Sequence, residues 1–208
     1  MKLPEEFSDK SEWVLVGPMG PELPEELRRH PVMAVDGGAH FARTPEVWIG
    51  DSDSYREVPG AGVQFPLPEN KDASDFSCAL SLLREQKRLI IHLWGFSGGR
   101  KDHELFVWGE ALRFLEEHPE SRMIIYDPKG RVETHLLAQG QWRFQGEGTF
   151  SLGSLSKTRV RLTGAVRYPI TQESWLPPLS SWGLSNVGSG EILLDTGGAL
   201  FIHFPGEA

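Results

Sequence analysis

The sequence predicts an α/β protein with an additional all-β region: an N-terminal three-layer α/β domain with a mostly parallel sheet, then a C-terminal β-sandwich. Up to about residue 130, short apolar runs alternate with stretches of helical periodicity. Beyond it, apolar runs are punctuated by Gly and Pro, with no long helical period. The turn signal Asp127-Pro128-Lys129-Gly130 separates the two patterns. We therefore expect two domains, residues 1–130 and residues 131–208.

The expected elements of the first domain follow from its apolar spacing. Continuous apolar runs suit strands that are buried on both faces of a parallel sheet, and they occur at residues 13–16, 32–35, 47–49, 89–94 and 123–126. Helical periodicity predicts helices over residues 21–29, 74–86 and 102–118. In the second domain, strands are expected at residues 132–137, 141–144, 159–163, 191–194 and 199–204.

Composition limits the partners of the chain. Of 208 residues, 21 are Lys or Arg and 29 are Asp or Glu, which gives a formal net charge of −8. This balance argues against a nucleic-acid binder, and a ligand with phosphates would need a bridging metal cation. One cysteine, Cys78, excludes an internal disulfide and a multi-cysteine metal site. Without an apolar leader or a membrane-length apolar run, we expect a cytoplasmic protein with no membrane contact.

Acidic and glycine-rich segments follow three of the predicted strands. They are Asp36-Gly37-Gly38-Ala39, Gly50-Asp51-Ser52-Asp53-Ser54 and Gly98-Gly99-Arg100-Lys101-Asp102-His103. Ligands of open α/β sheets bind outside the carboxyl ends of strands, so we expect a site at this edge. Asp51 and Asp53 are two residues apart and point the same way in an extended segment, which suits one Mg²⁺ ion. The alternative is an Asx-turn that satisfies local backbone groups.

Two segments open predicted helices, and the roles of their carboxylates stay open. In Lys71-Asp72-Ala73-Ser74-Asp75, the polar residues either cap the helix or form a second acidic patch near Asp51. Before the longest helix, Gly98 and Gly99 allow a phosphate to approach the backbone, and Arg100 can bind its oxygens. Asp102 is either an N-cap or a metal ligand. The sequence contains neither a Walker A motif nor a G-x-G-x-x-G motif at these positions.

In this order, the segments resemble the motifs of the thiamine pyrophosphokinase family. The matching segments are Asp36-Gly37-Gly38-Ala39, Ile49-Gly50-Asp51-Ser52-Asp53-Ser54, Lys71-Asp72-Ala73-Ser74-Asp75-Phe76, Gly98-Gly99-Arg100-Lys101-Asp102-His103 and Ser185-Asn186. The resemblance covers most of the chain, from about Val14 to His203. Three positions depart from the family's pattern: His40 stands where Asn is usual, Glu46 where Asp is expected, and Ser52 replaces a bulky apolar residue.

The resemblance implies a fold, a reaction and an assembly. The fold is an N-terminal α/β domain with a C-terminal β-sandwich, assembled as a homodimer whose site lies in a cleft between the subunits. In the implied reaction, the hydroxyl of thiamine attacks the β-phosphorus of ATP and gives thiamine diphosphate and AMP. Mg²⁺ is the implied cofactor, ATP the co-substrate and thiamine the acceptor.

Site residues are carried over motif by motif. The resemblance implies a Mg²⁺ and phosphate cluster of Asp51, Asp53, Asp72, Asp75 and Asp102. It implies nucleotide contacts from Asp36, Gly37, Gly38, Lys71, Gly98, Gly99 and Arg100, and a thiamine pocket with Ser185 and Asn186. The catalytic set is Asp51, Asp72, Asp102 and Arg100, with Asp72 and Asp102 as equal candidates for the base. Tyr168 or Trp182 would stack on thiamine; the alternative for both is core packing.

Other functions are compatible with parts of this pattern. A pyrophosphokinase for another acceptor, such as a hydroxymethylpterin, would keep the fold and the metal site. A non-catalytic module would bind a nucleotide or thiamine without turnover, but such a module has no need of five aspartates. The Asp pairs alone would also suit a metal-dependent phosphohydrolase.

Overall fold

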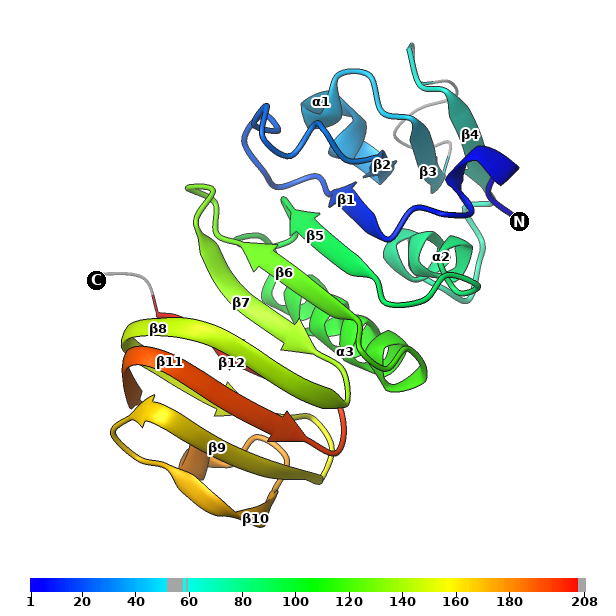
Figure 1. Cartoon of the computed structure of the whole chain (residues 1–208). Helices are drawn as coiled ribbons and strands as arrows, with labels where there is room; N and C mark the ends of the chain where they lie inside the picture. The colour runs from blue at the N-terminus through cyan, green and yellow to red at the C-terminus, as the bar shows by residue number, and fades with distance from the viewer. Residues whose placement is uncertain (52–57, 59, 206–208) are drawn as a thin grey trace.

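The structure, a computed structural model, describes residues 1–51, 58 and 60–205, and is built on a continuous series of paired strands (Figure 1). Among these residues, the twelve strands lie in the order β10-β9-β11-β8-β12-β7-β6-β5-β1-β2-β3-β4. The strands are β1 (Glu12–Val16), β2 (Val32–Val35), β3 (Val47–Asp51), β4 (Val63–Leu67), β5 (Ile90–Trp94), β6 (Arg122–Tyr126), β7 (Val132–Leu137), β8 (Gly140–Gly153), β9 (Thr158–Val166), β10 (Ile170–Leu176), β11 (Asn186–Thr196) and β12 (Leu200–His203). The helices are α1 (Ala39–Ala42), α2 (Asp75–Leu82) and α3 (Lys101–Glu117), with short 3-10 helices η1 (Glu5–Phe7), η2 (Asp36–Gly38) and η3 (Ser181–Gly183).

The N-terminal strands β4, β3, β2, β1, β5 and β6 pair in parallel. Val14 in β1, for example, is opposite Val32 on one side and His92 on the other. Because the strands run in one direction, their carboxyl ends meet at one edge of the sheet. The segments that follow β1, β2 and β5 therefore gather at this edge, together with Asp51, the last residue of β3.

Two layers of chain cover the parallel strands. On one face, α2 and α3 pack against Trp13, Leu15 and Ile91 in the largest apolar cluster. On the other face, α1 and the segment 17–31 cover Val14 and Trp48. The alternation of side chains along each strand sends successive apolar residues to opposite faces, which explains why the runs are apolar throughout. The mixed α/β character predicted for this part is confirmed.

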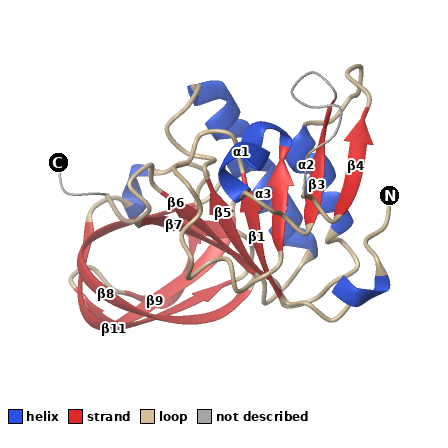
Figure 2. Ribbon diagram, turned by 90° about the horizontal axis from the view of Figure 1, so that it is seen from above, coloured by secondary structure: helices blue, strands red, loops and turns tan. Residues whose placement is uncertain are grey.

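Antiparallel pairing begins at β7, which pairs with β6 across the predicted boundary at residue 130. Strand β8 is long enough to pair with two neighbours, with β12 at Leu152 and with β11 along residues 140–150. The antiparallel strands curl around a separate apolar cluster that includes Phe150, Leu162 and Ile192 (Figure 2). The sandwich and the division into residues 1–130 and 131–208 stay predictions.

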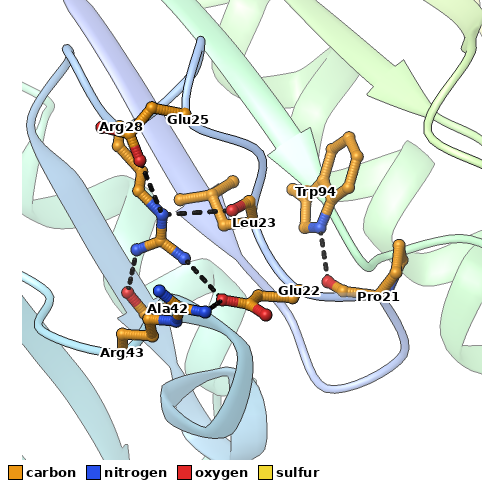
Figure 3. A network of polar contacts seen from close by, with 8 residues as sticks. All are labelled: Pro21, Glu22, Leu23, Glu25, Arg28, Ala42, Arg43 and Trp94. Atoms are coloured by element: carbon orange, nitrogen blue, oxygen red, sulfur yellow. Dashed lines mark hydrogen bonds and ion pairs between the residues drawn. The ribbon is translucent and has the colours of Figure 1, made fainter.

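The helix predicted over residues 21–29 is wrong. The structure has a series of turns there, closed by hydrogen bonds such as Leu27 N to Pro24 O (3.2 Å) and Arg28 N to Glu25 O (3.1 Å). Figure 3 shows the reason: the guanidinium of Arg28 donates to the carbonyl oxygens of Leu23 (3.1 Å) and Ala42 (2.7 Å). Leu23 therefore accepts from a side chain instead of from a helical amide. In the part of the chain that the structure describes, no helix has the length and apolarity needed to cross a membrane.

Candidate active site

Three carboxylates meet at the carboxyl edge of the parallel strands. Asp36 follows β2 directly, Asp51 is the last residue of β3, and Asp75 is the first residue of α2. One carboxylate oxygen from each lies within 4.8 Å of the other two. Adjacent parallel strands end side by side, with Val35 opposite Ile49, and this register brings Asp36 close to Asp51. The sequence placed Asp36 in the nucleotide region; the structure adds it to the acidic cluster.

Lys71 lies between two of these carboxylates. Its Nζ is 3.1 Å from Oδ2 of Asp51 and 2.9 Å from Oδ1 of Asp75, and all three side chains are mostly buried. Burial lowers the pKa of Lys71, but its hydrogen bonds to Asp75 and Asp51 outweigh this and raise the pKa above its usual value. Burial raises the pKa of Asp75. Lys71 lowers this pKa, the charges of Asp51 and Asp36 raise it, and the net effect is a raised pKa.

The backbone at Asp36 is unusual. Its φ of 50° is left-handed, a conformation that Asp tolerates better than most residues. The indole Nε1 of Trp48 donates to the Asp36 carbonyl at 3.2 Å. Two residues further on, a Cβ at Gly38 would collide with the carbonyl oxygen of Val16. The Asp-Gly-Gly segment is thus shaped by a close approach to β1, and this approach aims the carboxylate of Asp36 at the edge of the sheet.

The acidic cluster fits a hard divalent cation such as Mg²⁺. Such cations prefer carboxylate oxygens, and three carboxylates supply them here. Among the described residues, Oδ1 of Asp36 is buried and has no hydrogen-bond donor. A buried carboxylate oxygen without a partner is costly, and a cation would satisfy it. Asp53, which the sequence assigned to this cluster, lies outside the described residues.

A cavity of about 1000 Å³ adjoins the cluster. It lies between the loops after β1 and β5 and the first turns of α2 and α3. One part of its wall is charged, with Asp36, Lys71 and Asp75; another is apolar, with Phe96 and Phe106. The remaining lining residues are Pro18, Met19, Val35, Glu69, Ala73, Ser74, Phe76, Gly95, Gly99, Arg100, His103, Glu104, Val107 and Glu110. The combination suits a ligand with an anionic part and a flat apolar part.

The loop before α3 contributes Gly99 and Arg100 to this wall. Gly98 has a φ of 89°, which favours glycine, and α3 begins immediately after Arg100. Arg100 is exposed and pairs with Asp102, at 3.1 Å from Nε to Oδ1 and 2.5 Å from Nη2 to Oδ2. This pairing lowers the pKa of Asp102 to about 2. Asp102 is therefore ionised at neutral pH and is a weak proton acceptor.

The structure does not bring every predicted aspartate to the cluster. Asp72 is exposed, and neither Asp72 nor Asp102 is among the residues that line the cavity. Both alternatives for the segment 71–75 occur together. Ser74 is the N-cap of α2, with its Oγ accepting from Ser77 N at 3.0 Å, and Asp75 belongs to the acidic cluster with Asp51. Gly37 and Gly38 lie in η2, beside the cavity wall formed by Asp36.

The predicted acceptor residues lie in the antiparallel region. Asn186 is buried and holds the backbone of Tyr168, accepting from its amide at 3.0 Å and donating to its carbonyl at 2.8 Å. Tyr168 and Trp182 are both about half exposed, which excludes core packing for these rings in the isolated chain. Ser185 has a φ of 57°. Within one chain, none of these four residues lines the described cavity.

Several lining residues were not predicted as site residues. The rings of Phe96 and Phe106 and the carboxylate of Glu110 lack a local motif that distinguishes them from ordinary helix or loop residues. For Phe106, the signal was its place: an apolar residue on the exposed side of α3 near its N-terminus, where 66% of it is accessible. His103 also lines the cavity, from the first turn of α3.

The sequence matches no protein-family model and no curated protein. Its fold matches solved structures over nearly their whole length. Thiamine pyrophosphokinase from Bacillus subtilis aligns with a TM-score of 0.72 and 20% identity, over 95% of this chain and 100% of that chain. A thiamin pyrophosphokinase family protein from Enterococcus faecalis aligns with a TM-score of 0.73 and 19% identity, over 95% of this chain and 100% of that chain. Thiamin pyrophosphokinase from Candida albicans aligns with a TM-score of 0.71 and 13% identity, over 97% of this chain and 90% of that chain. The chain described here therefore has the thiamine pyrophosphokinase fold.

Proposed function

We propose that this protein transfers pyrophosphate from ATP to the hydroxyl of thiamine, giving thiamine diphosphate and AMP in a Mg²⁺-dependent reaction. The observation that carries the proposal is the cluster of Asp36, Asp51 and Asp75 beside a cavity with charged and aromatic walls. It occurs in a fold shared with thiamine pyrophosphokinases. Transfer of a highly anionic group depends mainly on positioning and charge stabilisation, and these residues supply both.

Each part of the site has a role in this proposal. Asp36, Asp51 and Asp75 would hold Mg²⁺, which offsets the charge of the triphosphate when bound. Arg100 and the backbone of Gly98 and Gly99 would bind phosphate oxygens at the N-terminus of α3. Lys71 has the reach and charge to contact a phosphate once a cation takes its place between the carboxylates. Asp72 and Asp102 stay the two candidates for the proton acceptor, and the ion pair with Arg100 lowers the pKa of Asp102 to about 2.

The acceptor side of the proposal involves a second copy of the chain. Thiamine is cationic, so an acidic site also attracts the acceptor. Ser185, Asn186 and an exposed aromatic ring, Tyr168 or Trp182, would reach the cavity from the partner subunit of a homodimer. Asn186 acts by fixing the backbone at Tyr168. The exposure of these rings in a single chain is compatible with a ligand or a subunit covering them.

The direct test is a product assay. Purified protein is mixed with ATP and Mg²⁺, with and without thiamine, and AMP and thiamine diphosphate are quantified by chromatography. We expect equimolar AMP and thiamine diphosphate only when thiamine is present. Nucleotide products that form regardless of thiamine would instead indicate a phosphohydrolase. Turnover with a hydroxymethylpterin alone would indicate another acceptor, and ligand-induced stabilisation without products would indicate a binding module.

Two variants test the proposed assembly. Asp51→Asn removes a cluster carboxylate and Trp182→Ala removes a proposed acceptor contact, so each alone should lose most activity. In a dimer with sites between the subunits, co-expression of both variants restores one intact site per heterodimer, or about a quarter of wild-type activity for random pairing. Asp9→Asn, at an exposed carboxylate, is the control and should retain activity. No recovery in verified heterodimers would overturn the shared site, while leaving the product assay unaffected.

A further inference from the structure

A second cluster of metal-ligating side chains lies away from the candidate active site. Glu12 is the first residue of β1, His92 lies in β5, and His30 precedes β2. Oε1 of Glu12 is 3.0 Å from Nε2 of His92 and 3.5 Å from Nε2 of His30. One ligand atom from each residue lies within 4.8 Å of the other two. We propose that Glu12, His30 and His92 bind a Zn²⁺ ion.

The distances from the Glu12 carboxylate to the two imidazoles fit tetrahedral zinc. With metal–ligand bonds of about 2.0–2.2 Å, neighbouring ligand atoms around zinc are separated by about 3.3 Å. The distances from Glu12 to the two imidazoles are on either side of this value. A solvent molecule would take the fourth position, since 35% of the Glu12 side chain is accessible. Two imidazoles and one carboxylate favour zinc over Mg²⁺ or Ca²⁺, which prefer sites with oxygen ligands only.

His92 has the surroundings of a metal ligand. Its Nδ1 is 2.8 Å from the hydroxyl of Tyr126, and this contact orients the ring so that Nε2 faces Glu12. The ring is buried, and this burial lowers the pKa of His92 against the opposing effect of Glu12. The imidazole is therefore neutral at pH 7, the form that binds zinc. On binding, Nε2 coordinates and Nδ1–H donates to the tyrosine oxygen.

His30 is positioned by the segment that precedes it. Figure 3 shows this segment held over the sheet by Arg28 and by the hydrogen bond from Trp94 Nε1 to the Pro21 carbonyl (2.8 Å). On its other side, the carbonyl of Pro31 accepts from Val14 N at 2.9 Å. The rings of His30 and His92 are stacked, with centroids 5.7 Å apart. The site would therefore connect β1, β5 and the β1–β2 segment.

Two positive charges oppose a cation at this site. Arg29 Nε donates a hydrogen bond of 3.3 Å to His30 Nε2, the proposed ligand atom, so zinc would have to displace it; the Arg29 side chain is exposed and can turn into solvent. Arg122 is close enough to lower the pKa of His92 and would weaken zinc binding. Glu12 begins β1, whereas the candidate active site starts beyond its other end, at Pro18. Zinc at Glu12 would thus stabilise the fold without entering the cavity, and this inference does not depend on the proposed function.

The test measures zinc binding to protein freed of metal with EDTA. Calorimetry at pH 7 should show one Zn²⁺ per chain with a Kd at or below about 10 µM, and zinc should raise the Tm. Co²⁺ should give the visible absorption of four-coordinate cobalt. His30→Gln and Glu12→Gln should each weaken binding at least tenfold and remove the Tm shift. These two residues are chosen because their side chains are more accessible than that of His92, and circular dichroism checks that both variants fold.

Two control variants locate the bound ion. His40→Gln changes an exposed histidine, and Asp51→Asn changes the acidic cluster; both should bind zinc as the wild type does. The proposal is overturned if the wild type binds no stoichiometric zinc, or if folded His30→Gln binds it equally well. Loss of zinc binding in Asp51→Asn would also overturn it, because the ion would then belong to the aspartates.

Discussion

Lys71 and the three carboxylates illustrate how single residues prepare this site. Asp36, Asp51 and Asp75 repel one another, and the ammonium of Lys71 offsets this repulsion by pairing with Asp51 and Asp75. It leaves Oδ1 of Asp36 without a donor among the described residues. The cluster is thus held together in the free protein but incompletely satisfied. This is the condition in which a divalent cation gains most from binding.

Gly38 and Gly109 should respond in opposite ways to substitution by alanine. At Gly38 the added Cβ meets the backbone of β1, which cannot move without breaking the sheet, so Gly38→Ala should destabilise the protein by more than about 3 kcal/mol. At Gly109, inside α3, nothing lies within 4 Å of the added Cβ. Gly109→Ala should therefore stabilise by about 0.5–1 kcal/mol. Urea denaturation measures both; equal effects would contradict the role given to the Gly38 contact.

At the scale of elements, the two strands that the sequence did not predict share a cause. Strands β4 and β10 were not predicted, and they are the two edges of the sheet order. An edge strand has one neighbour and solvent beside it, so it needs no continuous apolar run. Accordingly, β4 contains Pro66, and residues 171–173 of β10 are exposed and polar. The inner strands, in contrast, have neighbours on both sides, and each was predicted at least in part, although β8 and β11 extend well beyond the predicted residues 141–144 and 191–194.

Ser74 connects two helices and should matter more than its exposure suggests. Its Oγ caps α2 by accepting from Ser77 N (3.0 Å) and donates to Glu110 Oε2 in α3 (2.7 Å). Ser74→Ala should cost about 1 kcal/mol, the usual value for a lost N-cap. Ser81→Ala is the matched control: among the described residues, the Oγ of Ser81 donates only to the carbonyl of Cys78, and its loss should be close to neutral. Chemical denaturation compares the two, and equal costs would show that the cap contributes nothing specific.

At the scale of the molecule, the sequence predicted that Asp36, Asp51 and the loop before α3 lie at one edge of the sheet, but not the contacts between their side chains. Asp36 and Asp51 follow neighbouring parallel strands, so their proximity was a consequence of topology. That Lys71 would pair with Asp51, and Asp102 with Arg100, depends on loop conformations for which the sequence has no periodic signal. The Glu12–His30–His92 cluster also has no signal in the sequence, because the register of β1 and β5 brings Glu12 close to His92, and His30 is placed by the segment before β2.

His135 couples the stability of the whole molecule to pH. It lies in β7, next to the junction of parallel and antiparallel strands, facing Phe204, with Arg122 and His92 as neighbouring charges. Burial lowers the pKa of His135 to about 4, helped by those charges, from about 6.5 in the unfolded chain. As the pH falls from 6.5 to 4, the unfolded chain therefore binds a proton that the folded state does not, and stability decreases.

Between pH 7 and pH 4 this histidine should cost the folded state about 2–3 kcal/mol, after allowing for its partial exposure. Urea denaturation in EDTA across this range should show a shallower loss of stability for His135→Gln than for the wild type. The comparison uses the slope with pH, so a constant cost of the substitution does not affect it. His40→Gln, at an exposed histidine, should keep the wild-type slope. Identical slopes for His135→Gln and the wild type would mean that His135 titrates alike in both states, and that its burial at the junction is not maintained in solution.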